Sequence, residues 1–129
     1  MLILTSETAD TGLAERLSEA GAIVVRVPAT DGGELDLAAC TAALWEQGIR
    51  SVLCEGGSRL AGSLIRADAV HRATFYYAPL ILGSRGVPAF AADVSLSLDS
   101  EQWGTPVVRT LGRDVALTYD RRPHTSAGN

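Results

Sequence analysis

Two kinds of hydrophobic pattern alternate along the first half of the chain. Short apolar runs rich in β-formers predict strands at Met1–Leu4, Ala22–Val27 and Ile49–Cys54. The segments that follow the strands repeat apolar residues at helical spacing, and Gly21 and Gly48 are typical helix stops. The resulting strand–helix order predicts an α/β protein whose mostly parallel sheet is flanked by helices, with right-handed crossovers.

The stretch Ser51–Gly57 is the sharpest signal in this pattern. It reads as a buried strand that ends in Glu55 and two glycines, and Ser58 then serves as a candidate helix cap. A strand, a glycine turn and a helix N-terminus together direct backbone N–H groups at an anion. An ordinary βα turn remains the alternative interpretation, and Glu55 either contacts a ligand or caps locally.

The second half of the chain has a different pattern. Ala73–Ala78 is rich in β-formers and predicts a strand that ends before a proline. Thr105–Leu111 and Asp114–Asp120 flank a Gly-Arg pair, which predicts an antiparallel hairpin at the C-terminal end of the sheet. A short alternating run, Val94–Leu98, lies between the Ala73–Ala78 strand and this hairpin. Residues 121–129 are polar and predict a loose tail.

Two further loops carry groups that could contact a ligand. Thr5 and Ser6 follow the first predicted strand, where their hydroxyls either cap the next helix or contact a ligand at the carboxyl edge of the sheet. Gly83–Gly86 brings Arg85 into a flexible loop, which is either an anion loop or a solvated turn.

The composition excludes several classes of protein. The chain has 129 residues and a formal net charge of −4, which fits one acidic domain and argues against general nucleic-acid binding. All 11 cationic residues are Arg, so a Schiff-base lysine and a P-loop lysine are both excluded. No apolar run approaches the roughly 18 residues of a membrane span, and no basic leader is present, so we expect a cytoplasmic protein without membrane contact.

The cysteines and histidines do not form a chemical site in the sequence pattern. We interpret Cys40 and Cys54 as small buried hydrophobic residues in a reducing compartment, because their spacing suits neither a disulfide framework nor a metal site. His71 follows a helix end and His124 lies in the tail, so we assign neither a catalytic role. We therefore predict no metal site and name no catalytic residue.

Four segments, in the same order along the chain, resemble a known family. Cys54–Val70 resembles the Glu-Gly-Gly strand end and following helix of the reductase domain of bacterial riboflavin biosynthesis proteins, and Phe75–Gly83 its Ala-Pro-x-x-Leu-Gly signature. Leu111–Leu117 is similar to the final hairpin of that domain, and Ile3–Glu7 to its middle strand. The resemblance covers Leu2 to about Tyr119.

The resemblance implies a dihydrofolate-reductase-like fold and an NADPH-dependent reaction. The implied substrate is 5-amino-6-(5-phosphoribosylamino)uracil or a related phosphoribosylamino-pyrimidine, with hydride delivered to the opened sugar carbonyl. Glu55 would face this substrate or the nicotinamide ribose. Thr5 and Ser6 would lie near the adenosine 2′-phosphate. The residues implied to bind the cofactor are Thr5, Ser6, Gly56, Gly57 and Ser58.

The resemblance is to the later part of the family's domain only. We therefore expect residues 1–120 to form a partial reductase domain that is incomplete at its N-terminus, followed by the tail at 121–129. The acidic pair that the family commonly carries after the helix is replaced by His71 and Arg72, so the contact made by that pair is absent or altered.

Three hypotheses follow for what the chain does. It is part of a larger reductase, an inactive nucleotide-binding remnant, or a module that completes its sheet with another chain. Phe75–Tyr77 is either an aromatic interface strand for such assembly or part of the core. An exposed sheet edge favours self-association, so we expect a homodimer or a larger homo-oligomer.

Overall fold

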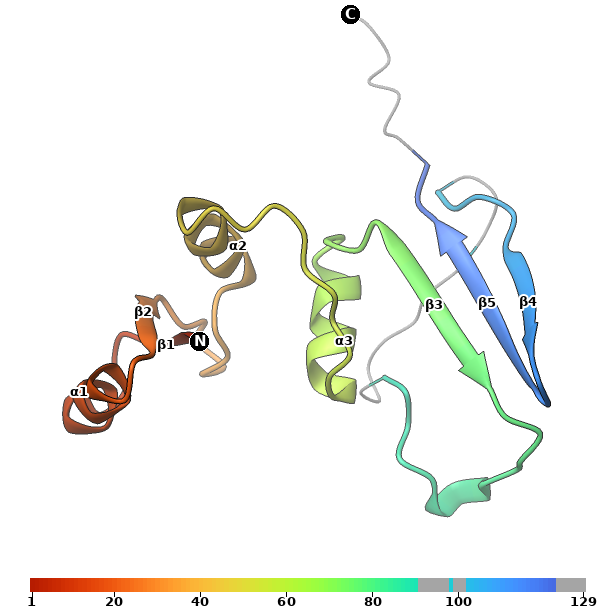
Figure 1. The fold of residues 1–129 in the computed structure, drawn as a ribbon, viewed down its shortest axis with the longest axis horizontal. Helices are drawn as coiled ribbons and strands as arrows, with labels where there is room; N and C mark the ends of the chain where they lie inside the picture. The colour runs from red at the N-terminus through yellow and green to blue at the C-terminus, as the bar shows by residue number, and fades with distance from the viewer. Residues whose placement is uncertain (91–97, 99–101, 123–129) are drawn as a thin grey trace, which may run out of the picture. The chain divides into compact units, whose positions relative to one another are not determined.

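A computed structural model of the chain describes residues 1–90, 98 and 102–122 (Figure 1). The chain divides into two compact units, Met1–Cys54 and Glu55–Asn129, and each has its own sheet. The first unit contains β1 (Leu2–Ser6), α1 (Thr11–Glu19), β2 (Ile23–Val27) and α2 (Leu37–Glu46). The second contains α3 (Ser58–Arg66), β3 (Arg72–Tyr77), a one-turn 3-10 helix (Gly83–Arg85), β4 (Val107–Leu111) and β5 (Asp114–Asp120).

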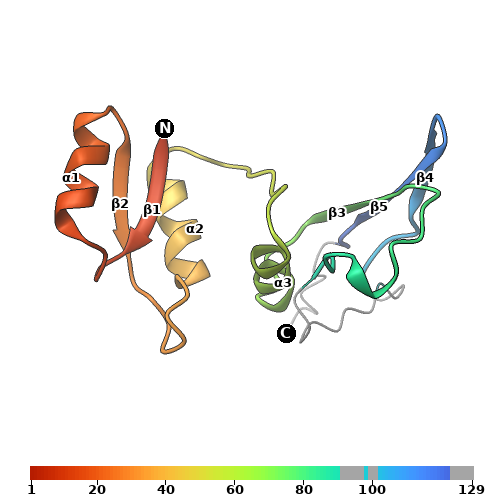
Figure 2. The ribbon, with the colours of Figure 1, turned by 90° about the horizontal axis from the view of Figure 1, so that it is seen from below.

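The sheet of the first unit is a parallel pair. β1 and β2 run in register from Leu2 opposite Ile23 to Ser6 opposite Val27. Helices α1 and α2 lie on opposite sides of this pair (Figure 2). The predicted strand–helix–strand–helix order is therefore confirmed here, since parallel neighbours need a crossover that carries a helix over one face.

The core of the first unit lies between β2 and α2. Its buried residues are Val27, which is 3% exposed, Cys40 and Ala43, and Leu4, Val25, Leu35 and Ala39 pack against them. Burial raises the pKa of the Cys40 thiol, with a smaller contribution from nearby Asp36. The prediction that Cys40 behaves as a buried hydrophobic residue is confirmed. For Cys54 it is wrong, because that residue is exposed.

Aspartates cap the first two helices. The carboxylate of Asp10 accepts a hydrogen bond from the Leu13 amide at 2.7 Å, and that of Asp36 accepts one from the Ala39 amide at 2.9 Å. Each bond satisfies one of the N–H groups that a helix leaves without a partner in its first turn. The predicted cap at Asp36 is confirmed.

The three α-helices that the structure describes end in the same way. The residue after the cap has a positive φ, which is 87° at Gly21, 80° at Gly48 and 59° at Asp68. In each case the next amide donates to a carbonyl of the last helical turn at 3.0 Å, which is the Schellman arrangement. The two glycine stops are confirmed. Asp68 is the exception that a sequence pattern does not indicate, because aspartate enters this region at an energetic cost.

The third predicted strand is not formed. Residues 49–56 carry neither helix nor strand, and Val52 and Leu53 are 66% and 82% exposed. The segment has the apolar, β-favouring composition of a strand. A strand also needs a neighbouring strand to pair with its N–H and C=O groups. β1 pairs with β2, β3 pairs with β5, and no described strand pairs with this segment, so the prediction of a buried strand at Ile49–Cys54 is wrong.

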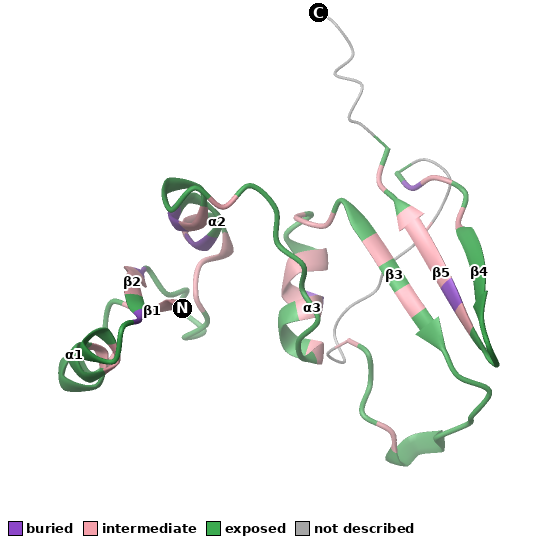
Figure 3. Ribbon diagram, in the orientation of Figure 1, coloured by how far each residue is buried: buried purple, intermediate pink, exposed green. Residues whose placement is uncertain are grey.

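The sheet of the second unit is antiparallel, with the order β3-β5-β4. β5 is the central strand, and it pairs with β3 from Arg72 opposite Asp120 to Tyr77 opposite Val115. Gly112 has a φ of 64° and allows the tight turn between β4 and β5, so the predicted hairpin is confirmed. β4 is exposed along its whole length (Figure 3).

The aromatic residues of β3 divide between two roles. Phe75 is half-buried and makes edge-to-face contacts with Tyr119 at 6.1 Å and Phe90 at 6.0 Å between ring centroids. Tyr76 and Tyr77 are 70% and 55% exposed. Core packing is therefore the correct alternative for Phe75, while homo-oligomer formation stays a prediction.

Trp103 and Arg121 join the end of α3 to the end of β5. Trp103 is 2% exposed, and the Arg121 guanidinium lies 5.5 Å from the centroid of its ring. The Arg121 side chain, which is 11% exposed, forms an ion pair with the carboxylate of Asp68. A charge buried this deeply is tolerated because it is paired and lies over an aromatic ring.

Two predictions concern segments that the structure does not describe in full. The alternating run Val94–Leu98, apart from Leu98, and the tail beyond residue 122 lie outside the described residues. Among the helices that the structure describes, none has the length and hydrophobicity to cross a lipid bilayer.

Candidate functional site

The N-terminus of α3 is the candidate anion site. Gly57 occupies the cap position with φ 36° and ψ 138°, and its carbonyl accepts the first helical hydrogen bond, from the Ala61 amide at 3.1 Å. Ser58 is the first residue inside the helix, so the prediction that Ser58 caps it is wrong. Because Gly57 has no side chain, the first turn of α3 has no side-chain acceptor of the kind that Asp10 and Asp36 provide in α1 and α2.

Charge around this helix end favours an anion. The first turn of α3 contains Arg59 and no acidic residue, and the helix dipole adds a partial positive charge at this end. Glu55 precedes the two glycines and is exposed, as are Gly56 and Gly57. A Cβ added at Gly56 or Gly57 would meet nothing within 4 Å, so another group has room to approach the backbone there.

The end of β1 holds the other predicted residues. Thr5 and Ser6 are its last two residues and are both half-buried, and the Ser6 hydroxyl lies 3.2 Å from that of Thr8. Asp10 occupies the cap position of α1, so the alternative that the strand-end hydroxyls serve as helix caps is wrong. Contact with a ligand stays a prediction for Thr5 and Ser6.

Arg26 also lies at this end of β1, and the sequence analysis did not identify it as a candidate residue. Arg26 lies on β2 opposite Thr5, and its guanidinium hydrogen-bonds to carbonyls of the loop that follows β1. The available signal was the single charge inside the apolar run Ala22–Val27, because a cation in a strand needs acceptors nearby. Those acceptors lie in another segment, which a local pattern does not reveal.

The predicted residues fall in both units. Thr5 and Ser6 belong to the first unit, and Glu55, Gly56, Gly57 and Ser58 belong to the second. Within the second unit, Glu55 to Ser58 are contiguous and lead directly into α3. The structure therefore describes two groups of candidate residues, each with its own geometry.

The remaining candidates are weaker. Gly83–Arg85 forms a one-turn 3-10 helix, and Arg85 is exposed, which fits the solvated-turn alternative for this loop. His71 is also exposed, and its carbonyl accepts a hydrogen bond from the Arg121 amide at 2.8 Å. His124 lies outside the described residues. In the described ranges, no group of three His, Cys, Asp or Glu side chains is placed to hold a metal ion.

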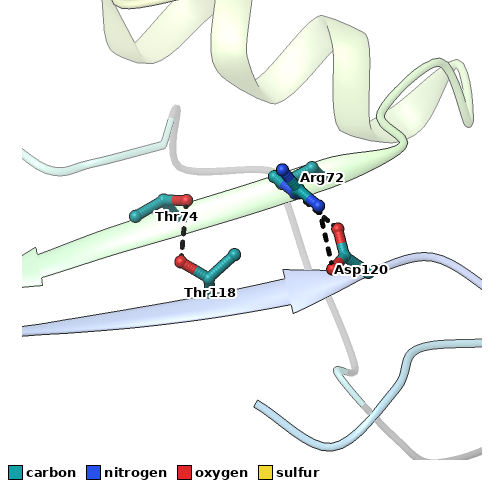
Figure 4. A network of polar contacts seen from close by, with 4 residues as sticks. All are labelled: Arg72, Thr74, Thr118 and Asp120. Atoms are coloured by element: carbon teal, nitrogen blue, oxygen red, sulfur yellow. Dashed lines mark hydrogen bonds and ion pairs between the residues drawn. The ribbon is translucent and has the colours of Figure 1, made fainter. Parts of the chain in front are cut away.

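Arg72, which stands where an acidic residue was expected, pairs across the sheet. Its Nε donates to Oδ1 of Asp120 at 2.5 Å and its Nη2 to Oδ2 at 3.1 Å, while the hydroxyls of Thr74 and Thr118 lie 3.1 Å apart on the same two strands (Figure 4). This forked contact is the geometry in which arginine binds carboxylate best. The hydrogen bond from Arg72, and then its charge, holds the pKa of Asp120 below its ordinary value.

We expect Asp120 to titrate below the ordinary range of an aspartate in an NMR pH titration of its carboxyl carbon. A lowered native pKa means that the pair stabilises the fold above the unfolded pKa, roughly 3.9, and that this contribution is lost as the pH falls through the native value. In Arg72→Gln the pKa should return to its ordinary value. The matched control Arg109→Gln, on the opposite edge strand β4, should leave it unchanged. An Asp120 pKa that is the same with and without Arg72 would contradict this assignment.

Comparison with known proteins gives a consistent result. A sequence profile of the family described as the RibD C-terminal domain matches residues 1–117. A protein named Riboflavin biosynthesis protein RibD, from Escherichia coli, is 37% identical over 87 residues, which is 66% of this chain and 23% of the relative. The protein of the same name from Bacillus amyloliquefaciens is 29% identical over 118 residues, which is 90% of this chain and 31% of the relative. The chain thus spans about a quarter to a third of the length of these two relatives.

Solved structures show the same fold. Acinetobacter baumannii RibD superposes with a TM-score of 0.68 at 19% identity, over 94% of this chain and 37% of that one. The Saccharomyces cerevisiae Riboflavin Biosynthesis Reductase Rib7 gives a TM-score of 0.70 at 22% identity, over 94% of this chain and 51% of that one. These likenesses confirm the predicted dihydrofolate-reductase-like α/β fold.

Proposed function

Because the chain belongs to the RibD C-terminal domain family, we propose that it forms part of an NADPH-dependent reductase of riboflavin biosynthesis. The proposed reaction is the reduction of 5-amino-6-(5-phosphoribosylamino)uracil, or of a related phosphoribosylamino-pyrimidine, at the opened sugar carbonyl. The family match and the four motifs that run from Leu2 to about Tyr119 support this proposal.

The observation that carries the proposal is the N-terminus of α3. A glycine cap without a side chain, no acidic residue in the first turn and a nearby Arg59 together suit a phosphate group. A dinucleotide offers such phosphates, and backbone N–H groups bind them without a charged side chain of their own. The residues present therefore fit the cofactor that the family resemblance implies.

The proposed roles follow from position along the chain. Gly56, Gly57 and Ser58 bind the cofactor phosphates, and Glu55 faces the substrate or the nicotinamide ribose. Thr5 and Ser6 lie near the adenosine 2′-phosphate. Hydride transfer is chemistry that the cofactor supplies when it is bound, whereas the protein orients the reactants and keeps water away. We name no residue of this chain as a proton donor.

Calorimetric titration of the purified chain with NADPH and with NADH tests this proposal. We expect saturable binding of NADPH and at least about tenfold weaker binding of NADH, which corresponds to about 1.4 kcal/mol. The difference arises because NADH lacks the 2′-phosphate that Thr5 and Ser6 are proposed to contact. Adding 2′,5′-ADP as a competitor, with 5′-AMP as its control, reports on that subsite alone.

Each outcome bears differently on the three hypotheses. Binding accompanied by oxidation of NADPH in the presence of the pyrimidine substrate supports a reductase. Binding without any turnover fits both an inactive nucleotide-binding module and a part of a larger reductase that needs the rest of its domain for turnover. A chain that gives no binding heat at millimolar NADPH contradicts the proposal and favours an assembly role.

A further inference from the structure

Arg26 gathers the carbonyl groups of the loop between β1 and α1. Its Nη1 donates to the carbonyl oxygens of Glu7 at 2.8 Å and Ala9 at 3.0 Å, with a longer contact of 3.5 Å to that of Ser6. Its Nη2 donates to the Thr11 hydroxyl at 3.4 Å. One half-buried side chain therefore contacts the end of β1, the loop and the first residue of α1.

These contacts hold the loop in one shape. The planar guanidinium has five N–H donors in a fixed fork, which few other side chains can match. Beyond Arg26, the loop is held by one long-range backbone hydrogen bond, from the Glu7 amide to the Val27 carbonyl at 3.1 Å. The other bonds are short-range, from the Ala9 amide to the Ser6 carbonyl at 3.1 Å and between the hydroxyls of Ser6 and Thr8. The carbonyl oxygens of Glu7 and Ala9 are therefore directed toward the Arg26 guanidinium.

Charge adds a second effect. The loop itself carries Glu7 and caps the helix with Asp10, so it presents two carboxylates. An anionic ligand near Ser6 would meet this negative charge, and Arg26 supplies a cation in direct contact with the same backbone. Coulomb interactions between charges a few ångströms apart are strong enough to alter the affinity for a phosphate.

We propose that Arg26 is a positioning residue that shapes the β1–α1 loop for the adenosine 2′-phosphate and thereby sets the preference for NADPH over NADH. This inference rests on the proposed function. Arg26 acts through the loop, because its donors are directed at carbonyls and the Thr11 hydroxyl. Thr5 and Ser6 remain the residues proposed to meet the phosphate.

The test compares nucleotide affinities of the full chain and three variants by calorimetry. Arg26→Gln should weaken NADPH binding about tenfold and NADH binding less than about twofold, because the loop that loses the Arg26 hydrogen bonds is the one proposed to meet the 2′-phosphate, which NADH lacks. Arg26→Lys keeps the charge but loses the fork, so it should restore part of the preference. Arg16→Gln removes the same charge from the last turn of α1 and should change neither affinity.

Amide hydrogen exchange tests the loop without any ligand. Exchange at Glu7 and Ala9 should become about tenfold faster or more in Arg26→Gln, whereas exchange at Leu4 inside β1 should not change. Unchanged exchange at both loop amides overturns the ordering role. Equal losses of NADPH and NADH affinity overturn the specificity role.

A chain that binds neither nucleotide contradicts the proposed function and overturns the specificity role with it. The exchange measurement then still decides whether Arg26 orders the loop. Failure of the inference and failure of the proposed function are distinguishable in this way.

Discussion

Gly57→Asp is expected to weaken NADPH binding by at least about 100-fold, which corresponds to about 2.7 kcal/mol. Gly57 has a φ of 36°, and a side chain there costs about 1–2 kcal/mol of backbone strain. The new carboxylate would also stand at the N-terminus of α3, where the cofactor phosphates are proposed to bind, and like charges repel strongly in such a place. Calorimetric titration with NADPH measures the loss.

Two control variants separate the causes of that loss. Gly57→Ala introduces the strain without the charge, so it should retain a measurable part of the affinity. Gly112→Asp places the same side chain at another positive φ, 64°, in the β4–β5 turn, and it should leave the affinity unchanged. If Gly57→Asp bound NADPH as tightly as the wild-type chain, α3 would not be the phosphate site.

Trp103→Ala is expected to lower the free energy of unfolding of the second unit by about 3–5 kcal/mol. The ring is 2% exposed and lies beneath the Arg121 guanidinium, so its removal leaves a cavity next to a buried charge. A loss of this size is a large share of the 5–15 kcal/mol that stabilises a typical domain. Chemical denaturation followed by circular dichroism and by the NMR signals of β3 and β5 measures it.

Matched variants test whether burial is the cause of this loss. Trp103→Phe keeps most of the ring volume and removes an indole N–H that has no acceptor among the described residues, so it should cost less than about 1.5 kcal/mol. Trp45→Ala removes a tryptophan that is 61% exposed and is stacked by the Arg50 guanidinium, and it should cost less than about 1 kcal/mol. Equal losses for Trp103→Ala and Trp45→Ala would contradict the cluster as described.

Local signals in the sequence predicted much of the fold. The glycine stops at Gly21 and Gly48, the Asp36 cap and the β4–β5 hairpin all depend on residues close together in the chain. Their physical causes, which are a positive φ or one short hydrogen bond, act within a single turn. A reader of the sequence can recognise them without knowing the partner elements.

Features that depend on distant partners were not predicted. The strand expected at Ile49–Cys54 has the right composition but pairs with no described strand. Arg26 acts on a loop because its register opposite Thr5 brings it there. Asp68 adopts a positive φ at a helix end while its carboxylate pairs with Arg121. In each case the cause lies in a segment that the local pattern does not contain.

The candidate site was likewise predicted only in part from the sequence. Gly56 and Gly57 were identified as a place where backbone N–H groups could meet an anion, and the glycine cap at the start of α3 agrees with that interpretation. The roles of Thr5, Ser6, Ser58 and Glu55 toward a ligand stay predictions, because they depend on a bound molecule. The sequence could indicate the kind of group these residues suit, while affinity and specificity also depend on neighbours such as Arg26.

The strand order β3-β5-β4 also has a consequence for how the chain is made. The central strand of this sheet is the last to be synthesised, so β3 leaves the ribosome well before its partner exists. At roughly 5–20 residues per second, β3 waits about 2 to 9 s for β5 to be translated. β1 and β2 are joined by one helix and can pair much earlier. The first unit can therefore fold during translation. In the second unit, the aromatic strand β3, which contains Phe75–Tyr77, stays unpaired and prone to aggregation until the β4–β5 hairpin emerges.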